Sequence, residues 1–235
     1  MNREEMDRIL KDAERPDYRI DEARMDQIRS AVTSQLKPAR PLPRNPVLVA
    51  ISLAAFALIV LLGSLDGGHM ALTMMSGPKM VAYFGALLLL AVLFSFAIVD
   101  QIIPGSKRRI NPITLLAGAA LLLVVLTPVL FQNFELRGFV EGGWPCLKFG
   151  TFFAILGGAL GFRLARGGFL TSPMEASLLL GCFAGLSGAT ALACVCPFFN
   201  APHILVWHFG TMVVGTAAGA GIGLILEWQA SRKKR

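Results

Sequence analysis

Residues 46–65 read PVLVAISLAAFALIVLLGSL, a stretch without a charged side chain. A helix of about 20 apolar residues, rising about 1.5 Å per residue, crosses the roughly 30 Å hydrocarbon core of a membrane. Comparable apolar runs follow along the chain at about 78–103, 112–131, 145–164, 173–195 and 202–228. The sequence therefore predicts an all-α integral membrane protein in which residues 46–228 form a bundle of six transmembrane helices.

A proline stands at the start of every apolar run. Proline suits the first helical turn because the N–H group that it lacks would have no partner there. We therefore expect helices to begin at Pro46, Pro78, Pro112, Pro145, Pro173 and Pro202. Glu175 also follows Ser172 at the spacing of a capping box, which predicts this motif at the start of the fifth helix.

Basic side chains gather in one set of the segments that flank the runs. That set carries Lys37, Arg40, Arg44, Lys107 to Arg109, Arg163, Arg166 and Arg232 to Arg235, whereas the other set carries only Lys79, Arg137 and Lys148. The positive-inside rule places the first set in the cytoplasm. An even number of spans then puts both termini there, including the basic tail at 229–235. The net charge of +7 follows from this arrangement and indicates no direct binding of nucleic acid.

Residues 1–45 differ in composition from the rest of the chain. They hold ten of the 22 Lys and Arg residues and nine of the 15 Asp and Glu residues. The pattern predicts two short amphipathic helices, the second from about Asp21, and a stiff tether containing prolines 38, 41 and 43. The apolar faces hold Met6, Ile9 and Leu10 in the first helix and Met25, Ile28 and Val32 in the second.

These two helices are too short to bury much apolar surface without a partner. The partner could be a soluble protein, another copy of the chain or the membrane surface. A helix that lies on a membrane normally has a strongly basic polar face. Acidic and basic residues nearly balance in this segment, so we favour a protein partner, with a loosely ordered, solvated segment as the alternative.

Glycines recur at helical spacing in the last three runs, as Gly157–Gly161, Gly181–Gly185, Gly215–Gly219 and Gly219–Gly223. Small residues four positions apart let helix backbones approach closely in lipid. The acidic residues Asp100, Glu175 and Glu227 fall at the ends of runs rather than at mid-membrane. Because ion-coupled transporters usually need ionisable groups at depth, this pattern counts against a transporter.

Cysteine and histidine residues gather at the outer ends of the last three predicted helices. Cys146, Cys194, Cys196 and His203 share one membrane level. Cys146 could form a disulfide with Cys194 or Cys196. The thiols and His203 could instead bind a soft metal ion, or a thiol could sense an oxidant. The alternative is that the cysteines only fill space in the bundle, which is the interpretation we favour for Cys182.

His208 lies roughly 9 Å below the outer start of the sixth helix, from the helical rise. We expect a packed, hydrogen-bonded histidine there more than a ligand. The candidate signal-sensing residues are Cys146, Cys194, Cys196, His203 and His208, and the candidate metal ligands among them are Cys146, Cys196 and His203.

No catalytic motif accompanies these residues. The sequence has no G-x-S-x-G, no H-E-x-x-H and no phosphate-binding glycine loop. We therefore expect neither an enzyme nor a small-molecule substrate. We also expect no cofactor, apart from a soft metal ion as a signal.

The second half of the chain resembles a known family in a series of short motifs. They read Pro-Cys-Leu at 145–147, Arg163 to Arg166, Thr-Ser-Pro at 171–173, Gly-Cys-Phe-Ala-Gly-Leu-Ser-Gly-Ala at 181–189, Cys-Pro at 196–197 and Trp-His at 207–208. This series, with a short polar segment before six spans, is similar to the six-span membrane anti-sigma factors of the negative-regulator-of-sigma-F family. The resemblance implies that the N-terminal segment holds an extracytoplasmic-function sigma factor inactive at the bacterial inner membrane.

The same resemblance implies that Cys146 and Cys196 face the periplasm and sense metals or oxidants. The expected partners are therefore a sigma factor and membrane lipid. Two other functions fit the residues. A small-solute or metal-ion transporter would need a polar path through the bundle, and a redox or metal-handling membrane enzyme would use the same cysteines.

Overall fold

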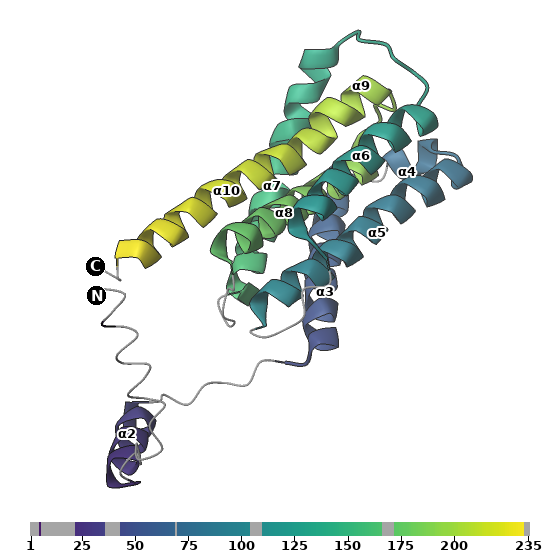
Figure 1. Cartoon of the computed structure of the whole chain (residues 1–235). Helices are drawn as coiled ribbons and strands as arrows, with labels where there is room; N and C mark the ends of the chain where they lie inside the picture. The colour runs from purple at the N-terminus through teal and green to yellow at the C-terminus, as the bar shows by residue number, and fades with distance from the viewer. Residues whose placement is uncertain are drawn as a thin grey trace. The chain divides into compact units, whose positions relative to one another are not determined.

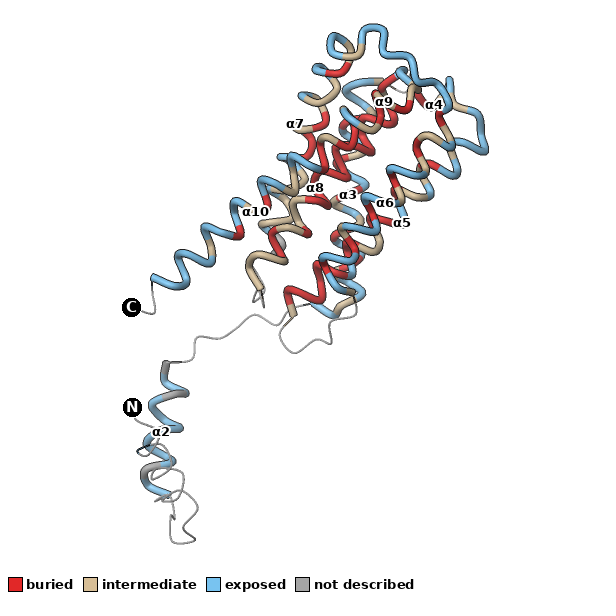
Figure 2. Tube along the Cα trace, turned by 45° about the horizontal axis from the view of Figure 1, so that its top comes forward, coloured by how far each residue is buried: buried red, intermediate tan, exposed pale blue. Residues whose placement is uncertain are grey.

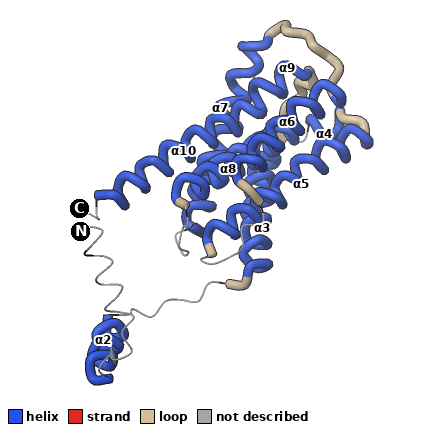
Figure 3. Tube along the Cα trace, viewed as in Figure 1, coloured by secondary structure: helices blue, strands red, loops and turns tan. Residues whose placement is uncertain are grey.

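The computed structural model describes residue 5 and residues 22–35, 43–68, 70–103, 110–165 and 172–232. Its regular secondary structure is helical, and no strand occurs among the described residues (Figure 3). The chain divides into two compact units, Met1–Pro41 and Leu42–Arg235.

The N-terminal unit contains helix α2 (Glu22–Gln35), which lies where the second amphipathic helix is predicted. Met25 and Ile28 are exposed on this helix. The predicted first helix, with Met6, Ile9 and Leu10, lies outside the described residues, and so does the side chain of Val32.

The second unit is built from six long helices, as predicted, and each is long and apolar enough to cross a membrane. Five of them are α3 (Asn45–Gly67), α5 (Gly77–Ile102), α6 (Pro112–Leu130), α7 (Phe139–Ala165) and α8 (Pro173–Val195). The sixth begins as α9 (Ala201–His203), passes through the π-helical turn η1 (Ile204–His208) and continues as α10 (Phe209–Arg232). A short helix, α4 (Met70–Met74), lies between α3 and α5.

Successive long helices run in opposite directions, which gives the bundle two ends (Figure 1). We call the end with residues 131–138 and 196–200 the thiol end, because Cys146 and Cys196 lie there. The opposite end, where α3 begins and α10 ends, is the terminal end. The thiol end is the end of the bundle at which the sequence predicts Cys146, Cys194, Cys196 and His203 to share one membrane level.

Helix α8 is the centre of the bundle and packs against α10, α7, α3 and α5. In its most apolar stretch 78% of the residues are buried, against 44% or less in the other long helices. Figure 2 shows the buried residues concentrated on α8 and on the faces turned toward it. A shift of α8 would therefore displace residues that contact most of the other long helices.

Glycine makes this dense packing possible, as predicted. A side chain at Gly181 would collide with the carbonyl oxygen of Gly215 on α10, and one at Gly219 would collide with that of Ser177 on α8. On the opposite side of α8, a side chain at Gly188 would collide with the carbonyl oxygen of Gly150 on α7. Backbone therefore touches backbone along both of these helix pairs.

Five of the six predicted prolines stand in the first turn of a helix: Pro46, Pro78, Pro112, Pro173 and Pro202. The sixth prediction is wrong, because α7 begins at Phe139 and carries Pro145 inside. Pro145 can stand inside this helix because its missing N–H removes only one backbone hydrogen bond, close to the start of the helix. The additional turns also bring the Phe139 ring against that of Trp207, with centroids 5.4 Å apart. The last helix runs beyond the predicted end at 228, to Arg232, so part of the predicted tail is helical.

The predicted capping box at the start of α8 is also wrong. The hydroxyl of Ser172 makes no capping hydrogen bond. The Glu175 carboxylate instead accepts a hydrogen bond from the Gln101 amide of α5, at 3.2 Å. This contact joins α5 to α8 at the terminal end, where Asp100 and Gln101 are also buried.

Candidate functional site

Four side chains with metal-binding atoms meet at the thiol end. Cys146, Cys196, His203 and His208 each offer one such atom, and all four atoms lie within 4.8 Å of one another. The two sulfur atoms are 3.5 Å apart. The Cys196 sulfur also lies 3.4 Å from Nε2 of His203. We call these four residues the thiol–imidazole cluster.

The two cysteines come from the two helices that pack through Gly150 and Gly188. Cys146 lies in α7. Cys196 follows the last residue of α8, and its backbone N–H donates to the Leu192 carbonyl oxygen at 2.9 Å. The sulfur–sulfur contact therefore forms where the two helices are already held together, and it is too long for a disulfide bond.

His203 is positioned by the short loop before the last helix. The side chain of Asn200 accepts a hydrogen bond from the backbone N–H of His203 at 2.9 Å and caps α9. The backbone N–H of Ala201 donates to the carbonyl oxygen of Asn133 at 2.8 Å, which ties this start to the loop before α7. The His203 ring packs beside Phe198, with centroids 5.2 Å apart.

His208 reaches the cluster because of the π-helical turn. In an α-helix two residues five positions apart point roughly 140° away from each other at about 100° per residue. In η1 the backbone N–H of Phe209 donates to Ile204, an i to i−5 bond, so residues five apart come closer to the same face. The His203 and His208 rings thus meet edge to face, with centroids 5.4 Å apart and 76° between the ring planes.

Trp207, the residue before His208, packs against α7. A side chain at Gly143 of α7 would collide with the indole ring of Trp207. The glycine therefore leaves the space that the indole fills, and the ring of Phe139 covers it. The indole N–H is buried and has no hydrogen-bond partner.

The cluster is mostly shielded from solvent. His203 and His208 are each 2% exposed, Cys196 is buried, and Cys146 is half-buried. Neither ring nitrogen of His208 has a hydrogen-bond partner. Its main electrostatic neighbours are the Cys146 thiol and His203. The ring is packed, as expected, and a buried imidazole whose nitrogens lack well-formed hydrogen bonds is costly to keep.

The two thiols differ in acidity because they lie side by side. Hydrogen bonding to Cys146, together with burial, raises the pKa of the Cys196 thiol. Cys196 is therefore the member of the pair that keeps its proton and can donate it to the sulfur of Cys146. A ligand that binds both sulfur atoms must displace this proton.

The structure brings together four of the five predicted signal-sensing residues, Cys146, Cys196, His203 and His208, and so adds His208 to the three predicted metal ligands. It does not bring Cys194 into the cluster, although Cys194 is only two residues from Cys196. Cys194 and Cys182 are both buried within α8. Sequence reasoning missed the part played by Gly143 and Trp207, and the only signal for it was a glycine pair in front of Trp144.

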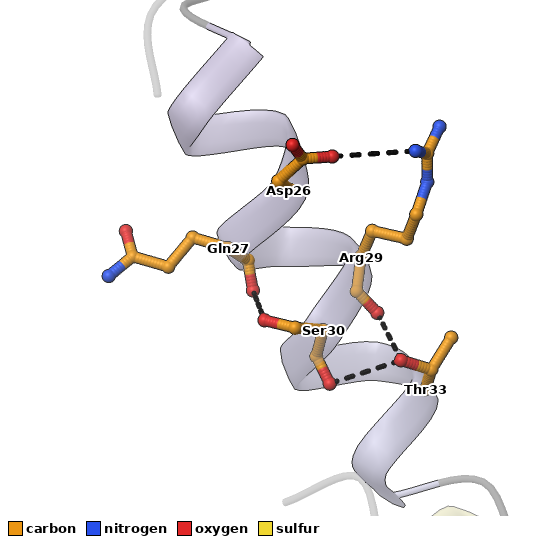
Figure 4. A network of polar contacts seen from close by, with 5 residues as sticks. All are labelled: Asp26, Gln27, Arg29, Ser30 and Thr33. Carbon is orange, nitrogen blue, oxygen red and sulfur yellow. Dashed lines mark hydrogen bonds and ion pairs between the residues drawn. The ribbon is translucent and has the colours of Figure 1, made fainter.

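The N-terminal candidates lie on α2, where Met25 is 44% and Ile28 is 54% exposed. Polar contacts join other residues of the same helix to one another (Figure 4). Arg29 pairs with Asp26 at 3.4 Å, and the hydroxyl of Thr33 donates to the carbonyl oxygen of Arg29 at 2.7 Å. The described apolar side chains of α2 are thus open to a partner.

Two hollows along the bundle bear on the transporter alternative. One, of about 340 Å³, lies between α7, α8 and α10, and the other, of about 520 Å³, lies between α6, α8 and α10. Small and apolar side chains form most of both linings. A path for a polar solute needs polar groups at depth, so these hollows give the transporter no support.

Comparison with known proteins gives one match. The model of the family described as negative regulator of sigma F matches residues 32–228. The match covers the six long helices except the last turn of α10, and it leaves residues 1–31 outside. No curated protein and no solved structure matches the chain.

Proposed function

The chain belongs to the negative-regulator-of-sigma-F family, and from this premise we propose that it is an anti-sigma factor that sequesters an extracytoplasmic-function sigma factor at the bacterial inner membrane. The family match carries the proposal, because it spans most of the chain and names a regulator of a sigma factor. The six apolar helices supply the membrane anchor. A regulatory family also favours a protein without catalytic activity.

The N-terminal segment is the sigma-binding part in this proposal. Met25 and Ile28 are exposed apolar side chains among the described residues of α2. An amphipathic helix that docks by such a face uses residues three and four positions apart as anchors. Met6, Ile9, Leu10 and Val32 are expected to contribute to the same surface.

The charge distribution supports an orientation with both termini in the cytoplasm. Arg44, Arg163 and Arg232 lie at the terminal end. The positive-inside rule then places the thiol end in the periplasm. The sigma factor would thus be held on the side where transcription occurs, and the cysteines would meet external chemicals.

The signal is read by Cys146 and Cys196 in this proposal. Two sulfur atoms 3.5 Å apart can share one thiophilic metal ion. They can also be oxidised by hydrogen peroxide, which is reduced to two waters as the two thiols form one disulfide. Either reaction changes the contact by which Cys146 of α7 meets Cys196 at the end of α8. Because α8 contacts most of the bundle, that change can bias the arrangement at the terminal end and release the sigma factor.

Transcription in the host tests the regulatory role. Overproduction of the full chain should lower a group of transcripts whose promoters share one recognition sequence. A version that lacks residues 1–36 should leave those transcripts unchanged, although it reaches the membrane in equal amount. Equal repression by both versions would contradict the assignment of sigma binding to the N-terminal segment.

A further inference from the structure

We infer that Cys146, Cys196, His203 and His208 together bind one divalent ion of the zinc group, Zn²⁺ or Cd²⁺, in a closed four-coordinate site. The inference adds two histidine ligands and a coordination geometry to the thiol pair. The binding site stands on the structure alone. Its use as a signal receptor rests on the proposed function.

The distances within the cluster are close to those of a metal centre. With metal–sulfur bonds of about 2.3 Å and metal–nitrogen bonds of about 2.0–2.1 Å, the ligand atoms of a tetrahedral zinc site lie roughly 3.3–3.8 Å apart. The sulfur–sulfur distance is 3.5 Å and the distance from the Cys196 sulfur to His203 Nε2 is 3.4 Å. The widest separation in the cluster is within 4.8 Å. Rotation of side chains by small angles closes the remaining gap.

The state of His208 is the second observation that points to a ligand. Its ring is 2% exposed and both ring nitrogens lack a hydrogen-bond partner. The π-helical turn η1 holds this ring against His203 and near Cys146. Single π-helical turns occur frequently at functional sites. A bound ion would give the buried imidazole the partner that the protein does not supply.

The chemistry of the four ligands selects the ion. Thiolate and imidazole favour zinc-group and related transition-metal ions, whereas Ca²⁺ and Mg²⁺ take oxygen ligands. Four protein ligands fill a tetrahedral ion and leave no open position for catalysis. Two thiolates also cancel the charge of a divalent ion, so the centre is neutral overall and suits a buried site.

Binding is coupled to the thiol protons and to the packing of the bundle. Each ion displaces the proton that Cys196 shares with the sulfur of Cys146, so that both cysteines bind as thiolates. The ion then joins α7, the end of α8, α9 and η1 through single bonds to each. A disulfide between the cysteines removes two of the four ligands, so metal binding and oxidation exclude each other at this site.

Titration of the full-length protein tests the inference. The protein is purified in detergent, reduced, stripped of metal and titrated with Co²⁺, whose visible absorption reports tetrahedral thiolate coordination. We expect one Co²⁺ per chain with the tetrahedral absorption and release of protons as Co²⁺ binds, followed by displacement of Co²⁺ by Zn²⁺. If the wild-type protein does not bind Co²⁺, or gives a Co²⁺ spectrum of the six-coordinate type, this experiment is sufficient to overturn the inference.

Variants test each ligand. Cys196→Ser, His203→Gln and His208→Gln should each weaken Co²⁺ binding at least about tenfold and alter the spectrum. Cys194→Ser and Cys182→Ser are the controls, because these cysteines lie in α8 outside the cluster, and they should bind like the wild type. Unchanged affinity and spectrum in His208→Gln would contradict a four-ligand site. A chain that binds the ion but holds no sigma factor refutes the proposed function and leaves the site, whereas the reverse result refutes the site alone.

Discussion

Cys194 and Cys196 are two residues apart in the sequence, yet only the sulfur of Cys196 contacts Cys146. The reason is that α8 ends at Val195. Cys194 still points into the helix packing, near the hydroxyl of Ser64, whereas Cys196 follows the turn toward α9. The sequence alone left the partner of Cys146 open, because the residue at which a helix ends is hard to predict to within two positions.

This difference gives a matched pair of double variants for the sensing function. Cys146→Ser with Cys196→Ser should abolish the release of the sigma factor by Cd²⁺ or hydrogen peroxide, because both sulfur ligands are lost. Cys182→Ser with Cys194→Ser should retain the response, since it removes equally many thiols outside the cluster. Transcription from sigma-dependent promoters measures both. A full response in the first double variant would contradict sensing by this pair.

Substitution of two glycines of α10 tests how closely α8 and α10 pack. A methyl group at Gly219 would collide with the carbonyl oxygen of Ser177, whereas nothing lies within 4 Å of one at Gly221. Gly219→Ala should lower the free energy of unfolding by about 1–3 kcal/mol, because α8 and α10 must move apart. Gly221→Ala should leave it unchanged or raise it slightly, since alanine favours the helix.

Unfolding of the two variants in the same detergent, followed by circular dichroism, measures this difference. The comparison is well matched, because the positions are two residues apart in one helix and the substitutions are identical. Equal loss of stability in both variants would show that the close backbone contact at Gly219 is not what distinguishes them.

At the scale of elements, hydropathy predicted the long helices well because each must satisfy its own backbone in lipid. Proline position was a good guide at five starts and misleading at Pro145, where aromatic packing between Phe139 and Trp207 extends the helix. The turn η1 was not predictable. It coincides with the packing of Trp207 against Gly143, a tertiary contact that no local pattern encodes.

Helix α2 carries the prediction for partner binding. Ile28→Asp should weaken binding of the sigma factor at least about tenfold, because a charge would enter an apolar contact. Ser30→Asp is the control, since it adds the same charge to an exposed position roughly 200° away around the helix. Co-purification of the sigma factor with each variant measures the effect. Equal weakening by both would indicate binding by charge rather than by the apolar face.

The whole molecule has a predicted orientation that labelling can measure. Glu135 is exposed at the thiol end and Ser231 is exposed at the terminal end. In spheroplasts, a membrane-impermeant maleimide should label Glu135→Cys and spare Ser231→Cys, and inverted vesicles should give the opposite result. Peptide mapping identifies the labelled position. Labelling of Ser231→Cys in intact spheroplasts would place the C-terminus outside and contradict the proposed topology.

The two units of the chain carry different functional features. A membrane-anchored bundle carries the thiol–imidazole cluster at one end, and a separate polar unit carries the exposed apolar residues of α2. The family match covers residues 32–228, which include the whole of the bundle up to the last turn of α10.

The central claim is that the chain sequesters a sigma factor through its N-terminal unit. The most direct test is purification of the tagged full-length protein from host membranes beside a version that lacks residues 1–36, with identification of the proteins that accompany each. The account predicts a sigma factor with the full-length protein and none with the shortened version. A sigma factor with neither protein, or in equal amount with both, would contradict it.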